Sequence, residues 1–185
     1  MHKKFKWTLA VSLGLAAVAV QATDDLPRAY GPFQLGMKLG EFRKLTGAAV
    51  FGAQSGDTIS TLKAENLEKH VPAKNRARER NAGFVFAGKD PDSPLYQIGY
   101  TPDETDLQAF KANFARFGAP RTAKLDDTDR AALEWCQEGK TRVMVAYKVS
   151  AKRPLSVTIE ELGIMANALR EEGESLDRAT CGKWP

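Results

Sequence analysis

The sequence predicts an α+β fold in which short helices pack on an antiparallel sheet. In each half of the chain, an amphipathic helical stretch is followed by short runs of alternating apolar residues. With 43% hydrophobic and 27% charged residues, the composition excludes wholesale disorder, and 185 residues are enough to enclose a core. We therefore expect two similar helix-then-strands lobes, over residues 23–100 and 101–185, that form one compact unit.

The first half is expected to begin with a short helix followed by strands. Leu39, Phe42 and Leu45 recur at three-residue steps and so share one helix face, and Gly47 suits the position after the last turn. Residues 88–94 are rich in turn formers, so the runs on either side of them are expected to pair as a hairpin. The expected strands are 48–53, 58–64, 83–87 and 95–100; Phe84 and Phe86 should share one face, as should Tyr96, Ile98 and Tyr100.

The second half repeats this order. A helix is expected to start at a capping box formed by residues 101–104. Residues 105–108 offer a second possible start, one turn later. Gly118 and Pro120 end it, and strands at 131–137, 141–149 and 155–161 then lead to a last helix at 164–172. The helix stripe consists of Leu107, Phe110, Phe114 and Phe117, and the middle strand alternates at Val143, Val145, Tyr147 and Val149.

Two short segments resemble a known group of exported domains. Residues 35–47 read Leu-Gly-Met-Lys-Leu-Gly-Glu-Phe-Arg-Lys-Leu-Thr-Gly, and residues 117–120 read Phe-Gly-Ala-Pro. Both are similar to signatures of SmpA/OmlA and β-lactamase-inhibitor-protein-like domains. That resemblance implies small helix-plus-sheet modules, often in tandem, which bind proteins through the sheet face and loops and have no catalytic activity.

Residues 1–22 have the features of a secretory signal peptide. Lys3, Lys4 and Lys6 precede an apolar stretch of about 14 residues, shorter than the ~20 that a membrane-spanning helix needs. We expect cleavage after Ala22 and a periplasmic or secreted protein without a transmembrane segment. Removal of residues 1–22 leaves 24 Lys and Arg against 23 Asp and Glu, so bulk charge does not predict nucleic-acid binding.

The two cysteines are expected to form a disulfide. Cys136 and Cys181 are the only cysteines, and an exported chain enters an oxidising compartment. The bond would tie the C-terminal segment to the strand that contains Trp135. A redox-active pair is the weaker alternative, because there is no Cys-x-x-Cys spacing to lower a thiol pKa.

Two features are candidates for binding a partner. In an extended chain Arg76, Arg78 and Arg80 would point to one side, where guanidinium groups suit an acidic protein, a lipid A phosphate or an anionic glycan. The alternative is a solvated loop or a charged edge strand. Lys74 belongs to the same basic segment, residues 69–80. Trp184 would either pack beside the disulfide or anchor a partner.

The sequence contains no residue set that predicts catalysis, a metal or a cofactor. Two Cys and two His nearly exclude a zinc or haem site with several ligands, and His70 has no neighbouring serine signature. We expect a non-catalytic protein-binding module of the bacterial envelope, an adaptor or inhibitor, whose partner is another envelope or secreted protein. Two alternatives stay open: a carrier of an anionic lipid or glycan, and a small envelope hydrolase that uses His70.

Overall fold

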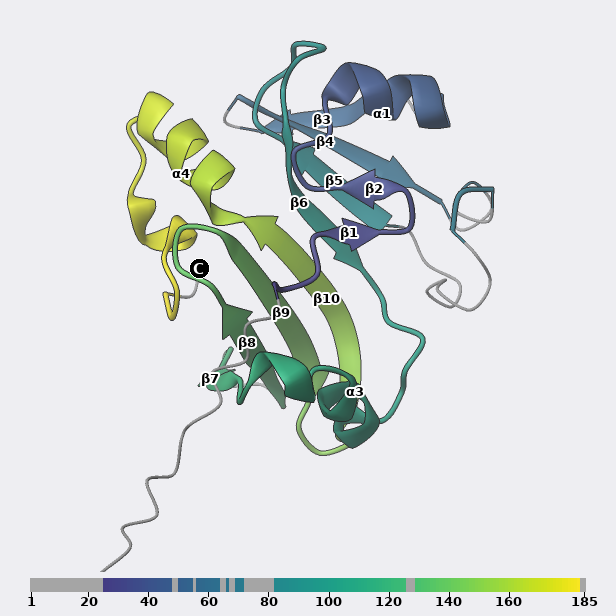
Figure 1. Ribbon diagram of the computed structural model, residues 1–185, viewed down its shortest axis with the longest axis vertical. Helices are drawn as coiled ribbons and strands as arrows, with labels where there is room; N and C mark the ends of the chain where they lie inside the picture. Colours follow the sequence, from purple (N-terminus) through teal and green to yellow (C-terminus); the bar gives the residue numbers. More distant parts are fainter. Residues whose placement is uncertain are drawn as a thin grey trace, which may run out of the picture.

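The protein is built around one large antiparallel sheet. The computed structural model describes residues 25–47, 50–54 (without their side chains), 56–63, 66, 69–71, 82–125 and 129–183. The order of the eight strands in the sheet is β3-β4-β5-β6-β10-β9-β8-β7 (Figure 1). Their bounds are β3 Val50–Gln54, β4 Asp57–Leu62, β5 Ala82–Phe86, β6 Leu95–Tyr100, β7 Arg121–Lys124, β8 Arg130–Cys136, β9 Thr141–Lys148 and β10 Arg153–Glu161.

Each half of the chain contributes a helix and four consecutive antiparallel strands. Helix α1 (Leu39–Thr46) precedes β3 to β6, whereas α3 (Leu107–Asn113) and the 3₁₀ turn η2 (Ala115–Phe117) precede β7 to β10. The last strands of the two halves, β6 and β10, pair with each other in the middle of the sheet. The expected α+β class, with short helices on an antiparallel sheet, is therefore confirmed.

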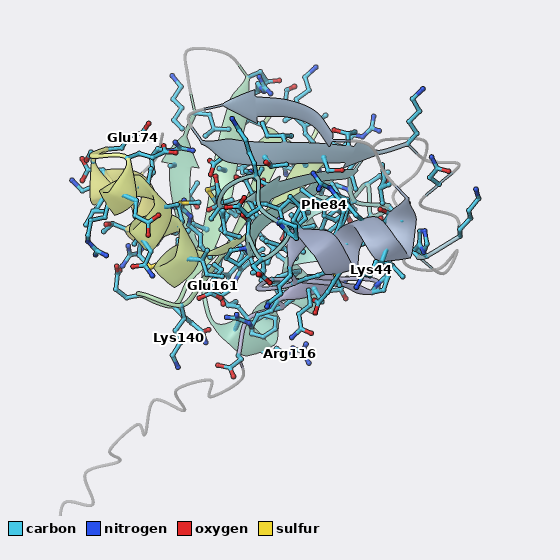
Figure 2. The ribbon with its side chains drawn as sticks, turned by 90° about the horizontal axis from the view of Figure 1, so that it is seen from above. Lys44, Phe84, Arg116, Lys140, Glu161 and Glu174 are labelled. Atoms are coloured by element: carbon cyan, nitrogen blue, oxygen red, sulfur yellow. A yellow bond between two sulfur atoms is a disulfide. The ribbon has the colours of Figure 1, made fainter. Side chains whose placement is uncertain are left out.

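The main core lies on one face of the sheet, which we call the core face. There the rings of Phe33, Phe42 and Phe84 lie within 5.4 Å of one another, centroid to centroid, and Phe86 packs against Phe42 at 5.2 Å. Helix α1 covers this cluster together with the small ribbon of β1 (Ala29–Tyr30) and β2 (Phe33–Gln34). In Figure 2 Phe84 lies in the interior beside α1, while Lys44 marks the solvent side of that helix.

The second helix starts later than the first capping frame predicts. Asp106 is the N-cap and its carboxylate accepts a hydrogen bond from the Gln108 amide, so the frame at 105–108 is nearer the true start than Thr101. The helix ends at Asn113, and Phe117 lies in the 3₁₀ turn. The aromatic stripe still packs together, with Phe114 against Trp135 at 4.9 Å.

Alternation of residues was misleading at two positions. The register shifts between Val85 and Phe86 opposite β6, and this bulge turns Tyr96 away from the face of Ile98. Strand β9 ends at Lys148, so Val149 lies beyond it and is 47% exposed. The patterns also did not predict β1, β2 and β7, which have at most four residues each.

Phe84→Ala should reduce the free energy of unfolding by about 3–5 kcal/mol, because the buried ring contacts two other rings and its removal leaves a cavity. Urea denaturation followed by circular dichroism measures the change. Leu45→Ala is the matched control: its side chain is 40% exposed and the expected loss is about 0.5 kcal/mol. Equal losses in the two variants would contradict this assignment of the core.

Candidate functional site

The opposite face of the sheet, which we call the second face, is only partly covered. Helix α4 (Leu162–Glu171) and the 3₁₀ turn η3 (Leu176–Ala179) pack over one end of it. Their apolar side chains form a smaller cluster with Tyr96 and Val85. Seen from above, α4 and Glu174 lie on the opposite side of the molecule from α1 (Figure 2). Among the described elements, α4 and η3 thus cover one end of the second face and leave the remainder uncovered.

A polar pocket lies where α4 meets β4 and β6. Its volume is about 280 Å³, including space open to solvent. Its lining combines apolar side chains with carboxylates, one phenol and one guanidinium group. The lining residues are Asp57, Tyr96, Met165, Ala168, Leu169, Glu172, Glu174 and Arg178.

Tyr96 and Asp57 form the main polar contact of this pocket. The Tyr96 hydroxyl donates a hydrogen bond to Asp57 Oδ2 at 2.5 Å. Burial raises the pKa of the Asp57 carboxyl, while the Tyr96 hydroxyl acts in the opposite direction by stabilising the charged form. Burial, the hydrogen bond and the negative charge of Asp57 all raise the pKa of Tyr96. The phenol therefore stays protonated and serves as a hydrogen-bond donor at neutral pH.

Arg142 organises a buried charge cluster beside the pocket. Its side chain is 2% exposed, and its Nε donates to Glu160 Oε2 at 2.6 Å. Glu134, also buried, lies 4.0 Å from the guanidinium group. Burial raises the pKa of the Glu160 carboxyl, and Arg142 opposes this shift. Two carboxylates thus share one guanidinium group away from water, an arrangement that needs further hydrogen bonds to be stable.

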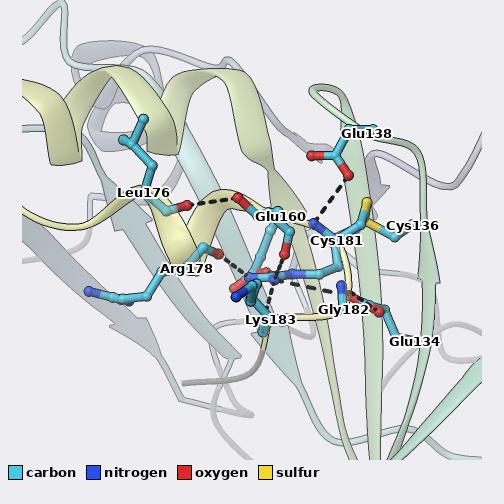
Figure 3. The surroundings of a disulfide bond; sticks show 11 residues. Glu134, Cys136, Glu138, Glu160, Leu176, Arg178, Cys181, Gly182 and Lys183 are labelled. Atoms are coloured by element: carbon cyan, nitrogen blue, oxygen red, sulfur yellow. Dashed lines mark hydrogen bonds and ion pairs between the residues drawn. A yellow bond between two sulfur atoms is a disulfide. The ribbon is translucent and has the colours of Figure 1, made fainter.

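The C-terminal segment supplies these further hydrogen bonds. Arg142 donates to the main-chain carbonyls of Arg178, Thr180 and Lys183, at 2.6–3.3 Å. The amide of Gly182 donates to both carboxylate oxygens of Glu134, at 3.0 and 3.1 Å (Figure 3). The charge cluster therefore recognises the backbone of residues 178–183 and holds it on the second face.

The expected disulfide is present next to this cluster. Cys136 in β8 is bonded to Cys181, with a Cα–Cα distance of 5.8 Å, and Glu138 accepts a hydrogen bond from the Cys181 amide (Figure 3). The prediction that the bond ties the C-terminal segment to the strand of Trp135 is confirmed.

The part of the second face that α4 and η3 leave uncovered is lined mostly by short side chains. Gly83 in β5 and Gly99 in β6 are direct cross-strand partners, and Gly99 also lies opposite Thr158 of β10. A Cβ placed on either glycine would meet no atom of a described, non-adjacent residue within 4 Å, and neither residue has a positive φ. We call this surface the floor; its half-buried residues are Thr61, Gly83, Gly99, Met144, Ala146, Ser156 and Thr158.

Several residues singled out in the sequence lie outside the described part of the chain. These are residues 1–22, Lys74, Arg76, Arg78, Arg80 and Trp184. His70 is described: it is half-buried, and its ring meets the edge of Phe33 at 6.0 Å. Glu160 and Glu161, neighbours in β10, point to different partners, Arg142 and Arg28. The two acids therefore do not converge on a common point.

Within the described ranges, no group of three or more His, Cys, Asp or Glu side chains is arranged to hold a metal ion. In the same part of the chain, none of the helices combines the length and the apolar character needed to cross a membrane. Comparisons with protein-family models, curated proteins and solved structures gave no match.

Sequence reasoning missed Arg142, Tyr96 and the glycine pair as features of this face. Arg142 lies near the start of an apolar strand, and a charged residue in such a strand is a signal for a buried and paired charge. Gly83 and Gly99 each lie inside an aromatic strand, where glycine weakens the strand and often marks a close approach of another chain.

Cys136→Ser/Cys181→Ser should lower the free energy of unfolding by about 2–4 kcal/mol, because the loop that the bond closes has a sequence separation of 45 residues. Urea denaturation with and without dithiothreitol measures the effect. The wild-type protein should lose stability on reduction, whereas the double variant should be insensitive to the reductant. An unchanged wild-type midpoint after complete reduction would contradict this role of the disulfide.

Tyr96→Phe should raise the pKa of Asp57 further, because the variant lacks the hydroxyl that stabilises the carboxylate while burial remains. An NMR titration of the side-chain carboxyl carbons measures this pKa directly. Asp129, whose pKa is lowered by its hydrogen bonds with Ser150 in the turn after β9, is an internal reference that should be the same in both proteins. A lower Asp57 pKa in the variant would show that the hydroxyl does not stabilise the charged form.

Proposed function

We propose that the protein is an exported, non-catalytic protein-binding module of the bacterial envelope that binds its partner through the floor of the second face. The observation that carries this proposal is the Gly83–Gly99 pair. Glycine inside a strand costs about 0.5–1 kcal/mol relative to alanine, and neither backbone angles nor neighbouring atoms require it at these two positions. A bare surface at the centre of the sheet allows another polypeptide to approach the backbone closely.

The arrangement of the charged groups supports binding rather than catalysis. Arg142, Glu134 and Glu160 are engaged with one another and with the C-terminal backbone, so their hydrogen bonds stabilise the fold. The floor itself presents hydroxyl, methyl and thioether groups, which make contacts without reactive chemistry. Export is supported by the disulfide, which suits an oxidising compartment, and by the signal-peptide pattern of residues 1–22.

Photocrosslinking from the floor tests the proposal. A benzophenone amino acid at Gly99, in the protein expressed with its own N-terminal segment, should crosslink to one discrete protein in an envelope fraction. The same probe at Thr122, exposed on the edge strand β7, is the matched control and should not give this product.

A second experiment places the benzophenone amino acid at Ser156 and compares the protein with and without Gly99→Arg. The Gly99→Arg variant should lose the crosslinked product, because an Arg side chain would fill the open space above the floor. Thermal unfolding should show that the variant keeps its fold. Absence of any discrete product from Gly99, or equal products from Gly99 and Thr122, would refute binding through the floor.

A further inference from the structure

A row of cations borders the floor at the end of the sheet away from the disulfide. Arg130 in β8 lies directly opposite Lys148 in β9, and Lys148 lies directly opposite Arg153 in β10. We infer that this row, which we call the cationic row, binds an acidic segment of the partner protein. The inference rests on the proposed function and specifies the chemistry of the partner.

The register places the cationic row on the same face as the floor. Lys148 follows Ala146 by two residues on β9, and successive residues on one face of a strand are two apart. Neighbouring strands are about 4.8 Å apart, so the three charged groups begin within about 10 Å of one another. All three residues are exposed, and they lie at the border of the floor.

The positive charge of the row is only partly balanced by described neighbours. Like charges directly opposite each other on adjacent strands are destabilising. In the described part of the chain, none of the three residues forms an ion pair that would offset this repulsion. The nearby carboxylate of Asp129 attracts Lys148, but it also accepts hydrogen bonds from the amide and the hydroxyl of Ser150, which fix it in the turn. One carboxylate does not balance three cations. A carboxylate-bearing ligand would relieve the repulsion within the row.

Apolar side chains beside the row favour a protein as the ligand. Val149 and Leu125 are 47% and 39% exposed, and their amides bond to the carbonyls of Asp129 and Arg130, respectively. Protein interfaces combine such apolar contacts with peripheral charges that steer the partner. The cationic row and the floor lie on one face of the sheet, and the two apolar side chains lie at the same end of the sheet as the row. Their combined chemistry matches an acidic segment with interspersed apolar residues.

Fluorescence anisotropy with a labelled peptide of alternating Glu and Ala tests this inference directly. The wild-type protein should bind the peptide at low ionic strength and more weakly at ~0.15 M salt. Arg130→Gln/Lys148→Gln/Arg153→Gln should weaken binding about tenfold or more. The matched control, Arg43→Gln/Lys44→Gln/Lys89→Gln, removes the same charge from exposed positions of the first half and should change binding by about twofold or less.

Other outcomes overturn the inference. No binding of the peptide by the wild-type protein, or equal losses in the two triple variants, would show that the row is not a specific acidic-segment site. Preferential, row-dependent binding of phosphatidylglycerol vesicles or duplex DNA over the peptide would assign the row to another class of ligand. Thermal unfolding of each variant confirms that the fold is retained.

The result is separable from the test of the floor. A discrete crosslink from Gly99 without peptide binding would leave the proposed function intact and reject the acidic partner. Row-dependent peptide binding without a crosslink from Gly99 would reject the floor as the binding surface, and with it the inference that the row serves the same partner.

Discussion

The pairing of β6 with β10 joins the two halves of the molecule into one structure. Four residue pairs, from Val157 opposite Tyr100 to Glu160 opposite Gln97, make the two four-stranded units continuous. Because side chains alternate across this seam, Ile98 and Ile159 meet in the main core while Gly99 and Thr158 meet on the second face. The shared core and the floor both depend on this one register, since a slip by a single residue would exchange the two faces.

The polar cluster around Arg142 fixes the C-terminal segment on the sheet. Residues 172–183 follow α4 and contribute few large apolar side chains to the core. The segment is instead held by main-chain hydrogen bonds to buried charges and by one covalent bond. Buried charges are costly unless they are paired and fully hydrogen-bonded. The C-terminal segment and the charge cluster therefore stabilise each other: each satisfies groups that the other would leave unpaired.

Sequence periodicity predicted most of the regular structure because burial on one face leaves a clear pattern. The apolar stripe of Leu39 and Phe42 predicted α1, and the alternation of Val143 and Val145 predicted β9. Very short strands such as β7 have too few residues to show a period, and the bulge at Tyr96 changes the face without changing composition. The disulfide followed from cysteine number and export. The floor could not be located, because it depends on which strands become neighbours across the two halves.

The contacts of Arg142 and Glu134 with the C-terminal segment involve main-chain atoms, which every residue type provides. Substitutions at Arg178, Thr180 or Lys183 therefore keep the carbonyls that Arg142 binds. Gly182 is different, because its φ of 75° disfavours any residue with a side chain there. Between α4 and Cys181, the structure therefore depends more on the number of residues than on their identity. An insertion or deletion there would shift the main-chain atoms away from Arg142 and Glu134, whereas most point mutations would leave them in place.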